Sequence, residues 1–259
     1  MAPGYPVERP APVADRDGRT TTRMGPLTGA TVDLYWLPLG AGGHCVRLNG
    51  RIFEALSTGL ERRPRNDLYH SALAVRLCAS AFVIEMTPIH IGDGTERGVV
   101  AEGAVGSRWA RSLPIFRYEI RRWRDGFIPD VAEAVASPQR LSVDPLVATR
   151  ILELVPRVPT PVWGRDELHA GEMWNSNSVT AWLISSSGPD VETVRLPANG
   201  RAPGWGAGVV VAQRQAVEAR LRVARVWDRR DESAETRSAN RPRLGCHSRP
   251  RARHSGYVR

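Results

Sequence analysis

Two short segments of the chain contain residue types that carry nucleophilic chemistry in other proteins. The first is WNSNSV, residues 174–179, in which Ser176 stands directly before an apolar run that predicts a helix. The second is LYHSALAV, residues 68–75, which places His70 in a predicted strand. A nucleophile at a helix N-terminus lies beside backbone N–H groups that stabilise an oxyanion, and a histidine acts as its general base. Ser176 and His70 are therefore the candidate nucleophile and base.

The same small polar residues have a purely structural interpretation. Ser and Asn are preferred at helix N-caps, because their side chains accept hydrogen bonds from backbone N–H groups that the helix itself leaves unpaired. On this interpretation WNSNSV only begins a helix over about 176–186, and Ser176 performs no chemistry. Both interpretations stay open at the level of the sequence.

Further residues complete the candidate site. A serine nucleophile needs a well-oriented histidine, and Glu85 in FVIEM is the candidate orienting group. A predicted hairpin over 69–86 brings Glu85 near His70, although a slip of one residue in register turns Glu85 to the other face. The WGRDE segment, residues 163–167, is expected to wall the same cleft, with its charged residues in ion pairs of a fixed loop. The candidate binding residues are Trp163, Trp174, Asn175 and Asn177.

These motifs resemble those of the circularly permuted papain-like superfamily, which includes the PPPDE deSUMOylating isopeptidases and the lecithin retinol acyltransferase group. Its members carry an Asn-Cys-x-x-Phe box at the start of a helix, well after a strand of the form His-x-x-x-x-Val. This chain shows the same order, with His70 first and Asn175-Ser176-Asn177-Ser178-Val179 later. Ser176 stands where the superfamily has its catalytic Cys, and Val179 stands where it has Phe. Residues 26–212 as a whole resemble a bacterial family without an assigned activity.

The resemblance implies a permuted papain-like layout and leaves two classes of function open. One is a hydrolase or acyltransferase of amide or ester bonds, with Ser176 as nucleophile, His70 as base and Glu85 as orienting group. The other is a catalytically inactive relative, because the Cys is missing, that keeps the cleft to bind a peptide or another protein. Neither class requires a cofactor.

The central part of the chain reads as strands followed by helices, which predicts an α+β domain with an antiparallel sheet packed against a few helices. Strict alternation in LPIFRYEIRRW, residues 113–123, predicts a strand with one solvated face. The predicted strands lie within 30–39, 44–56, 67–77, 80–89, 98–106 and 113–123, and the predicted helices lie within 129–137, 144–155, 176–186 and 211–226.

Charge and composition set the domain boundaries. Residues 1–27 are rich in Pro, Gly and Thr, and residues 226–259 are rich in Arg with few apolar side chains, so both are predicted to be disordered around a single domain over 28–225. The net charge of +9 belongs mainly to residues 213–259, which carry thirteen Arg and five acidic residues. This tail is expected to make at most weak, nonspecific contact with nucleic acid.

Other partners and locations follow from what the sequence contains. No apolar run approaches the length of a membrane span, and the N-terminus has no apolar segment of a secretory signal, so we expect a cytoplasmic protein that does not bind a membrane. Three widely spaced cysteines, Cys45, Cys78 and Cys246, fit neither a disulfide framework nor a zinc site. His44 beside Cys45 has no second ligand cluster, so we expect no metal.

Overall fold

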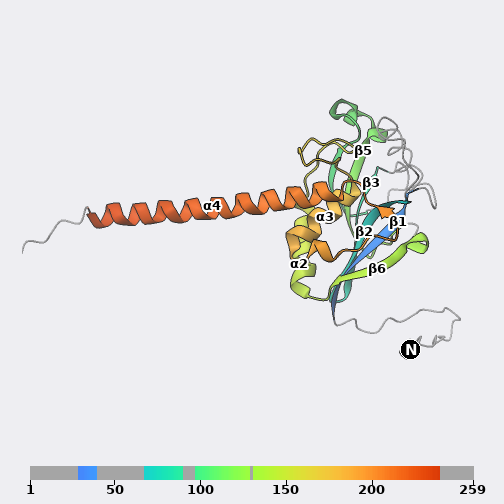
Figure 1. Ribbon diagram of the computed structural model, residues 1–259, viewed down its shortest axis with the longest axis horizontal. Helices are drawn as coiled ribbons and strands as arrows, with labels where there is room; N and C mark the ends of the chain where they lie inside the picture. Colours follow the sequence, from blue (N-terminus) through green and yellow to red (C-terminus); the bar gives the residue numbers. More distant parts are fainter. Residues whose placement is uncertain (1–28, 40–66, 90–96, 129–130, 240–259) are drawn as a thin grey trace, which may run out of the picture. The chain divides into compact units, whose positions relative to one another are not determined.

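The computed structural model of the chain describes residues 29–39, 67–89, 97–128 and 131–239 (Figure 1). The chain divides into two compact units at Arg214 and Gln215. The first unit contains the sheet, two helices that pack on it and the start of a third helix. The second contains the remainder of that third helix. The division falls before residue 225, where the sequence analysis ended the domain.

An antiparallel sheet forms the centre of the first unit. Six strands run in the order β4-β5-β3-β2-β1-β6, and every neighbouring pair is antiparallel. A short strand, β7, pairs in parallel with the start of β2. The predicted α+β class with an antiparallel sheet is confirmed. The strands are β1 (Ala30–Pro38), β2 (Asp67–Leu77), β3 (Ser80–Pro88), β4 (Val99–Ala104), β5 (Arg117–Arg124), β6 (Val135–Ser142) and β7 (Gly200–Arg201).

The predicted hairpin between the second and third of these strands is also confirmed. Strand β2 pairs with β3 from Leu73 opposite Ile84 to Leu77 opposite Ser80, so only a two-residue turn separates them. Apolar and β-branched residues at alternate positions fit a pleated, half-buried surface, and the short connection forces the two strands to run antiparallel. The hairpin carries both His70 and Glu85.

Three α-helices follow or accompany the later strands: α2 (Pro145–Leu154), α3 (Ser176–Ser187) and α4 (Trp205–Ala239). Helix α2 begins as its sequence predicts, with Pro145 in the first turn and the Asp144 side chain accepting a hydrogen bond from the Leu146 N–H. Short 3-10 helices occur at η1 (Arg108–Ser112), η2 (Pro114–Phe116), η3 (Val131–Glu133), η4 (Val155–Arg157) and η5 (Val191–Thr193).

Helices α2 and α3 cover one face of the sheet (Figure 1). The main core lies between them and the strands, and Trp182 and Leu183 of α3 belong to it as predicted. Burial of such side chains stabilises the fold by about 1.5–3 kcal/mol each. A smaller apolar cluster lies on the other face of the sheet, formed by Leu37, Ala72, Val83 and Ile128.

Two predictions about local structure are wrong. Residues 129–137 were expected to form a helix, but η3 is only one turn and β6 begins at Val135, because pairing with β1 outweighs the local helix propensity. Strand β5 was expected to have a solvated face, but Glu119 and Arg121 on that face are buried and form an ion pair with each other. Burial of this face is tolerated because the two opposite charges compensate each other.

Helix α4 is longer than the sequence predicts. It continues to Ala239, past residue 226, where the sequence analysis placed the start of a disordered tail. Ala, Glu and Arg are good helix formers and need no burial, and a Glu218–Arg222 pair one turn apart supports the exposed part of the helix. Residues 1–27 and 240–259 lie outside the described residues, as does the predicted strand 44–56. Among the described helices, none has the length and apolar content that crossing a membrane requires.

Candidate functional site

The N-terminus of α3 is closed by its own side chains. The Asn175 side-chain oxygen accepts hydrogen bonds from the N–H groups of Asn177 (2.9 Å) and Ser178 (3.2 Å). In return, the Ser178 hydroxyl oxygen accepts a hydrogen bond from the Asn175 N–H at 3.0 Å. This reciprocal arrangement is a capping box, in which two otherwise unpaired donors are satisfied at once. Asn175 and Ser178 are therefore structural residues of the helix start.

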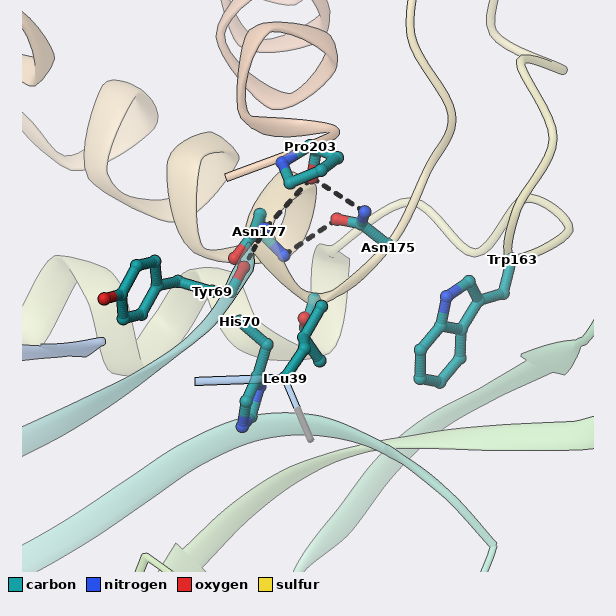
Figure 2. A pocket seen from close by; sticks show the side chains of 8 residues that line it. Leu39, Tyr69, His70, Trp163, Asn175, Asn177 and Pro203 are labelled. Atoms are coloured by element: carbon teal, nitrogen blue, oxygen red, sulfur yellow. Dashed lines mark hydrogen bonds between the residues drawn. The ribbon is translucent and has the colours of Figure 1, made fainter. Parts of the chain in front are cut away.

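The Asn177 side chain joins three parts of the fold (Figure 2). Its oxygen accepts a hydrogen bond from the Ser71 hydroxyl of β2 at 2.9 Å. Its nitrogen donates to the backbone carbonyls of Tyr69, at 2.9 Å, and of Pro203, at 3.0 Å, just before α4. The hydrogen bonds to Ser71 and to the Tyr69 carbonyl are buried. The Asn177 amide therefore supplies these two groups with the hydrogen bonds that water would otherwise make.

The segment before α4 is fixed against the same helix start. Gly204 adopts a positive φ of 83°, and a Cβ atom there would lie 2.6 Å from the Asn175 side-chain oxygen. The Gly204 carbonyl accepts a hydrogen bond from the Ser178 hydroxyl at 2.7 Å, and its N–H donates to the Glu172 carboxylate at 2.6 Å. Glycine is required here because of both the backbone conformation and the close approach.

A small pocket lies at this junction, and it brings several of the predicted site residues together (Figure 2). Its volume is about 20 Å³, which is room for roughly one water molecule. The Ser176 residue is buried, with 5% of its surface exposed. The lining residues are Leu39, Tyr69, His70, Trp163, Asn175, Ser176, Asn177 and Pro203.

His70 belongs to this pocket, but its imidazole points away from the Asn177 side chain (Figure 2). The strand register gives the reason. His70 pairs with Leu37 and is two residues from Ala72, and both of these belong to the smaller cluster on the face of the sheet opposite the main core. Successive side chains of a strand alternate between faces, so the neighbouring Ser71 is directed to α3.

Glu85 lies on the same side of the sheet as His70 and is not among the pocket residues. It is two residues from Val83, which belongs to the smaller cluster, and its partner across β5 is Arg121. Glu85 is buried, and Arg121 forms its ion pair with Glu119. The hairpin thus places Glu85 and His70 on one face of the sheet, and of the two only His70 also lines the pocket with Ser176.

Three backbone donors that follow Ser176 at the start of α3 are already used. The N–H groups of Asn177 and Ser178 donate to the Asn175 side chain, and the N–H of Val179 donates to the Asn175 carbonyl at 3.1 Å. Within the described residues, the Ser176 hydroxyl makes no hydrogen bond. An oxyanion needs donors aimed at an open position, and here the donors beside Ser176 are aimed at Asn175.

The two tryptophans predicted to bind are core residues in this structure. Trp174 has 1% of its surface exposed, and Trp163 has 5%. The Trp163 ring packs edge-on against Tyr118 at 5.9 Å between centroids, and burial raises the pKa of the Tyr118 phenol. The Trp163 ring also borders the pocket, so the WGRDE segment does form one of its walls (Figure 2).

A second concavity, which the sequence analysis did not identify, lies beyond Trp163. It has a volume of about 430 Å³ and is lined by residues 106–109, Val162 and residues 165–167. Glu167 pairs here with Arg108, at 2.8 Å and 3.2 Å, rather than with its sequence neighbour Arg165. The bond to Arg108 is the largest influence holding the pKa of the Glu167 carboxyl below its usual range, and Glu167 in turn raises the pKa of Arg108.

Three contributions to these sites escaped the sequence analysis: Ser71, Glu172 and the exposed Trp109. The alternation of β2 gave a usable signal for Ser71, because His70 and Ser71 must face opposite ways. Within the described residues no group of three or more His, Cys, Asp or Glu side chains is placed to hold a metal ion. Cys45 and His44 lie outside those residues.

The chain matches no protein-family model, and neither the curated proteins nor the solved structures include a significant match to it.

Proposed function

We propose that this protein is a catalytically silent binding module, whose partner is a peptide or another protein. The observation that carries the proposal is the engagement of the α3 N-terminus by Asn175, whose side chain takes the two backbone donors that follow Ser176. An oxyanion site at this helix end would draw on N–H groups that the cap also needs, and this helix uses those of Asn177 and Ser178 for the cap.

The magnitude of the competing effects supports this choice. Loss of one oxyanion donor lowers kcat by about 10²–10³ in serine hydrolases, and here the donors of both Asn177 and Ser178 are occupied. Freeing them would take these two donors from the oxygen of the buried Asn175 side chain and would lose a cap worth about 1 kcal/mol or more.

Access to Ser176 supports the same proposal. A pocket of about 20 Å³ holds a water molecule but not the acyl group and leaving group of an amide or ester. General-base catalysis also needs the histidine nitrogen within about 3 Å of the hydroxyl, and the imidazole of His70 is directed to the other face of the sheet.

We also propose that the protein is an inactive relative of the permuted papain-like superfamily. The order of the strand with His70 and the later helix with Ser176, together with the antiparallel sheet, supports it. We further propose a cytoplasmic site of action, because three widely spaced cysteines do not form the paired pattern of secreted domains. Binding of nucleic acid by the Arg-rich C-terminal segment remains a weak, secondary expectation.

An activity-based probe tests the proposal. The full chain is incubated with a fluorophosphonate, and labelled peptides are located by mass spectrometry, with Ser176→Ala as the matched control. We expect no labelling at Ser176 and identical behaviour of the two proteins. Covalent labelling of Ser176 in the wild type that disappears in His70→Ala would overturn the proposal and restore the hydrolase interpretation.

A further inference from the structure

The larger concavity is an open hollow in the surface, and we call it the Trp109 groove. One wall is residues 106–109, from the connection between β4 and β5, and the other comes from the segment 162–167. Its volume of about 430 Å³ lies in the range of small-ligand and side-chain pockets. Both walls belong to the first unit and to the described residues.

Hydrogen bonds hold the two walls of the groove together. The Gly106 N–H donates to the Trp163 carbonyl at 3.0 Å, and the Gly106 carbonyl accepts from Arg165 Nε at 2.8 Å. The two-pronged pair between Arg108 and Glu167 adds a third tie across the groove. A site whose walls are fixed in advance loses less conformational entropy when a partner binds.

Exposed apolar side chains lie on the connection that forms the first wall. Trp109, in the groove, has 93% of its surface exposed. Leu113 and Ile115, a few residues further along the same connection, are exposed to 55% and 64%. Tryptophan is the side chain most enriched among interface residues that dominate binding energy, and clustered exposed apolar residues mark interaction surfaces.

Two Arg and two carboxylates line the groove, and one of the Arg keeps free donors. The Asp166 carboxylate is occupied by the N–H groups of Ala170 (2.7 Å) and Gly171 (2.9 Å). The Glu167 carboxylate is occupied by Arg108 and by the Val162 N–H. Among the described residues, Arg165 forms no ion pair, since only its Nε is engaged, by the Gly106 carbonyl. Its two terminal nitrogens therefore provide the donor pair that a carboxylate accepts best.

We propose that the Trp109 groove binds a short segment of a partner protein in which an acidic residue lies beside an apolar or aromatic one. The acidic side chain pairs with Arg165, and the apolar side chain packs on the Trp109 ring. The assignment to a protein partner rests on the proposed binding function. The location of the site rests on the lining of the groove, on the exposed Trp109 and on the free donors of Arg165.

Other macromolecules fit the groove less well. Nucleic acid binding needs several cations along a phosphate backbone, and here Arg108 is already paired with Glu167 and two carboxylates line the same walls. Insertion into a bilayer surface favours apolar side chains backed by a continuous basic face rather than a concave site with acidic residues.

A random peptide library displayed on phage and selected on the full chain tests this inference. We expect enriched peptides with an acidic residue next to an apolar or aromatic one. The best peptide, labelled with a fluorophore, should bind Trp109→Ala and Arg165→Ala at least about tenfold more weakly than the wild type. Leu146→Ala and Arg150→Ala are the matched controls, because both side chains are exposed on α2 outside the groove, and they should bind as the wild type does.

A charge exchange gives the sharper test. Arg165→Glu should lose the selected peptide and should bind a version in which Lys replaces the acidic residue. Peptides without an acidic residue, or binding unchanged by both groove variants, would overturn the inference. So would Trp109-dependent sedimentation with phosphatidylcholine–phosphatidylserine vesicles in the absence of peptide binding. None of these experiments reports on the reaction of Ser176 with a fluorophosphonate. A negative result for peptide binding at the groove can therefore be told apart from a negative result for the proposed function.

Discussion

The Ser71 hydroxyl of β2 donates a 2.9 Å hydrogen bond to the side-chain oxygen of Asn177 at the start of α3. The residue before it, His70, is directed to the other face of the sheet. The side chain of β2 that contacts α3 is therefore the Ser71 hydroxyl, which has a structural role, and not a histidine that could act as a base. This bond and the cap together account for Asn175, Asn177 and Ser178.

The first prediction concerns this link between β2 and α3. Ser71→Ala leaves the buried Asn177 oxygen without its donor and should lower the free energy of unfolding by roughly 1–3 kcal/mol. Asn177→Ala should cost more, because it also removes the bonds to the Tyr69 and Pro203 carbonyls. Urea denaturation of both single variants and the double variant measures the coupling. Strictly additive losses would show that the bond contributes nothing.

The second prediction contrasts two adjacent residues of the motif. Asn175→Ala removes the cap and the bond from its side-chain nitrogen to the Pro203 carbonyl, so it should destabilise the fold by about 2 kcal/mol. Ser176→Ala removes a hydroxyl without a hydrogen-bond partner among the described residues and should change stability by less than about 0.5 kcal/mol. Thermal unfolding of the two variants decides the matter, and a larger loss for Ser176→Ala contradicts the capping account.

The third prediction concerns the contact between α3 and the first turn of α4. A Cβ atom on Gly208 would clash with the Ser178 carbonyl and would lie 2.9 Å from the Ala181 Cβ. Gly208→Ala should therefore destabilise the protein by about 1–3 kcal/mol, although alanine is the better helix former. Gly206→Ala is the control, because its Cβ would meet only the end of the Glu172 side chain, at 2.7 Å. Equal stability of the two variants would argue against close helix packing.

The fourth prediction is a pH dependence at the Trp109 groove. Because the folded-state pKa of Glu167 is depressed, its stabilising effect is complete above the unfolded value of about 4.3 and is lost as the pH falls through the lower folded value. The difference in unfolding free energy between the wild type and Glu167→Gln should be constant above about pH 5 and shrink below about pH 4. Its size should stay under about 1 kcal/mol, since the pair is exposed.

A difference between the wild type and Glu167→Gln that grows as the pH falls would reverse the sign and contradict the ion pair. The matched control is Glu153→Gln, an exposed residue of α2 that lies outside the groove. It should leave the pH profile of stability as it is in the wild type.

Local signals in the sequence were sufficient for several elements. Asp144 and Pro145 predict the start of α2, and Asn175 with the residues after it predicts the start of α3. In both cases the side chain acts on backbone groups two or three residues away, so no tertiary information is needed. The short turn after Leu77 fixed the hairpin in the same way.

Elements that depend on distant contacts were not predictable. Alternation shows that His70 and Ser71 face opposite ways, but which one meets α3 is decided by how the helix packs. The pattern of Glu119 and Arg121 is the same for a solvated face and for a buried one with paired charges. The Trp109 groove joins Arg108 to Glu167, and nothing in either local sequence indicates the other.

The central claim, that the α3 N-terminus is a structural anchor and not a reactive site, is tested most directly by the thiol pKa of Ser176→Cys. Site-resolved alkylation against pH gives this value, with the exposed Cys78 as internal reference. We expect a thiol with a pKa at or above the ordinary value of about 8.5, because its site is buried and the N–H groups of Asn177 and Ser178 are occupied, and we expect no change in His70→Ala. A thiol pKa below about 7 that returns to the ordinary value in His70→Ala would contradict the account.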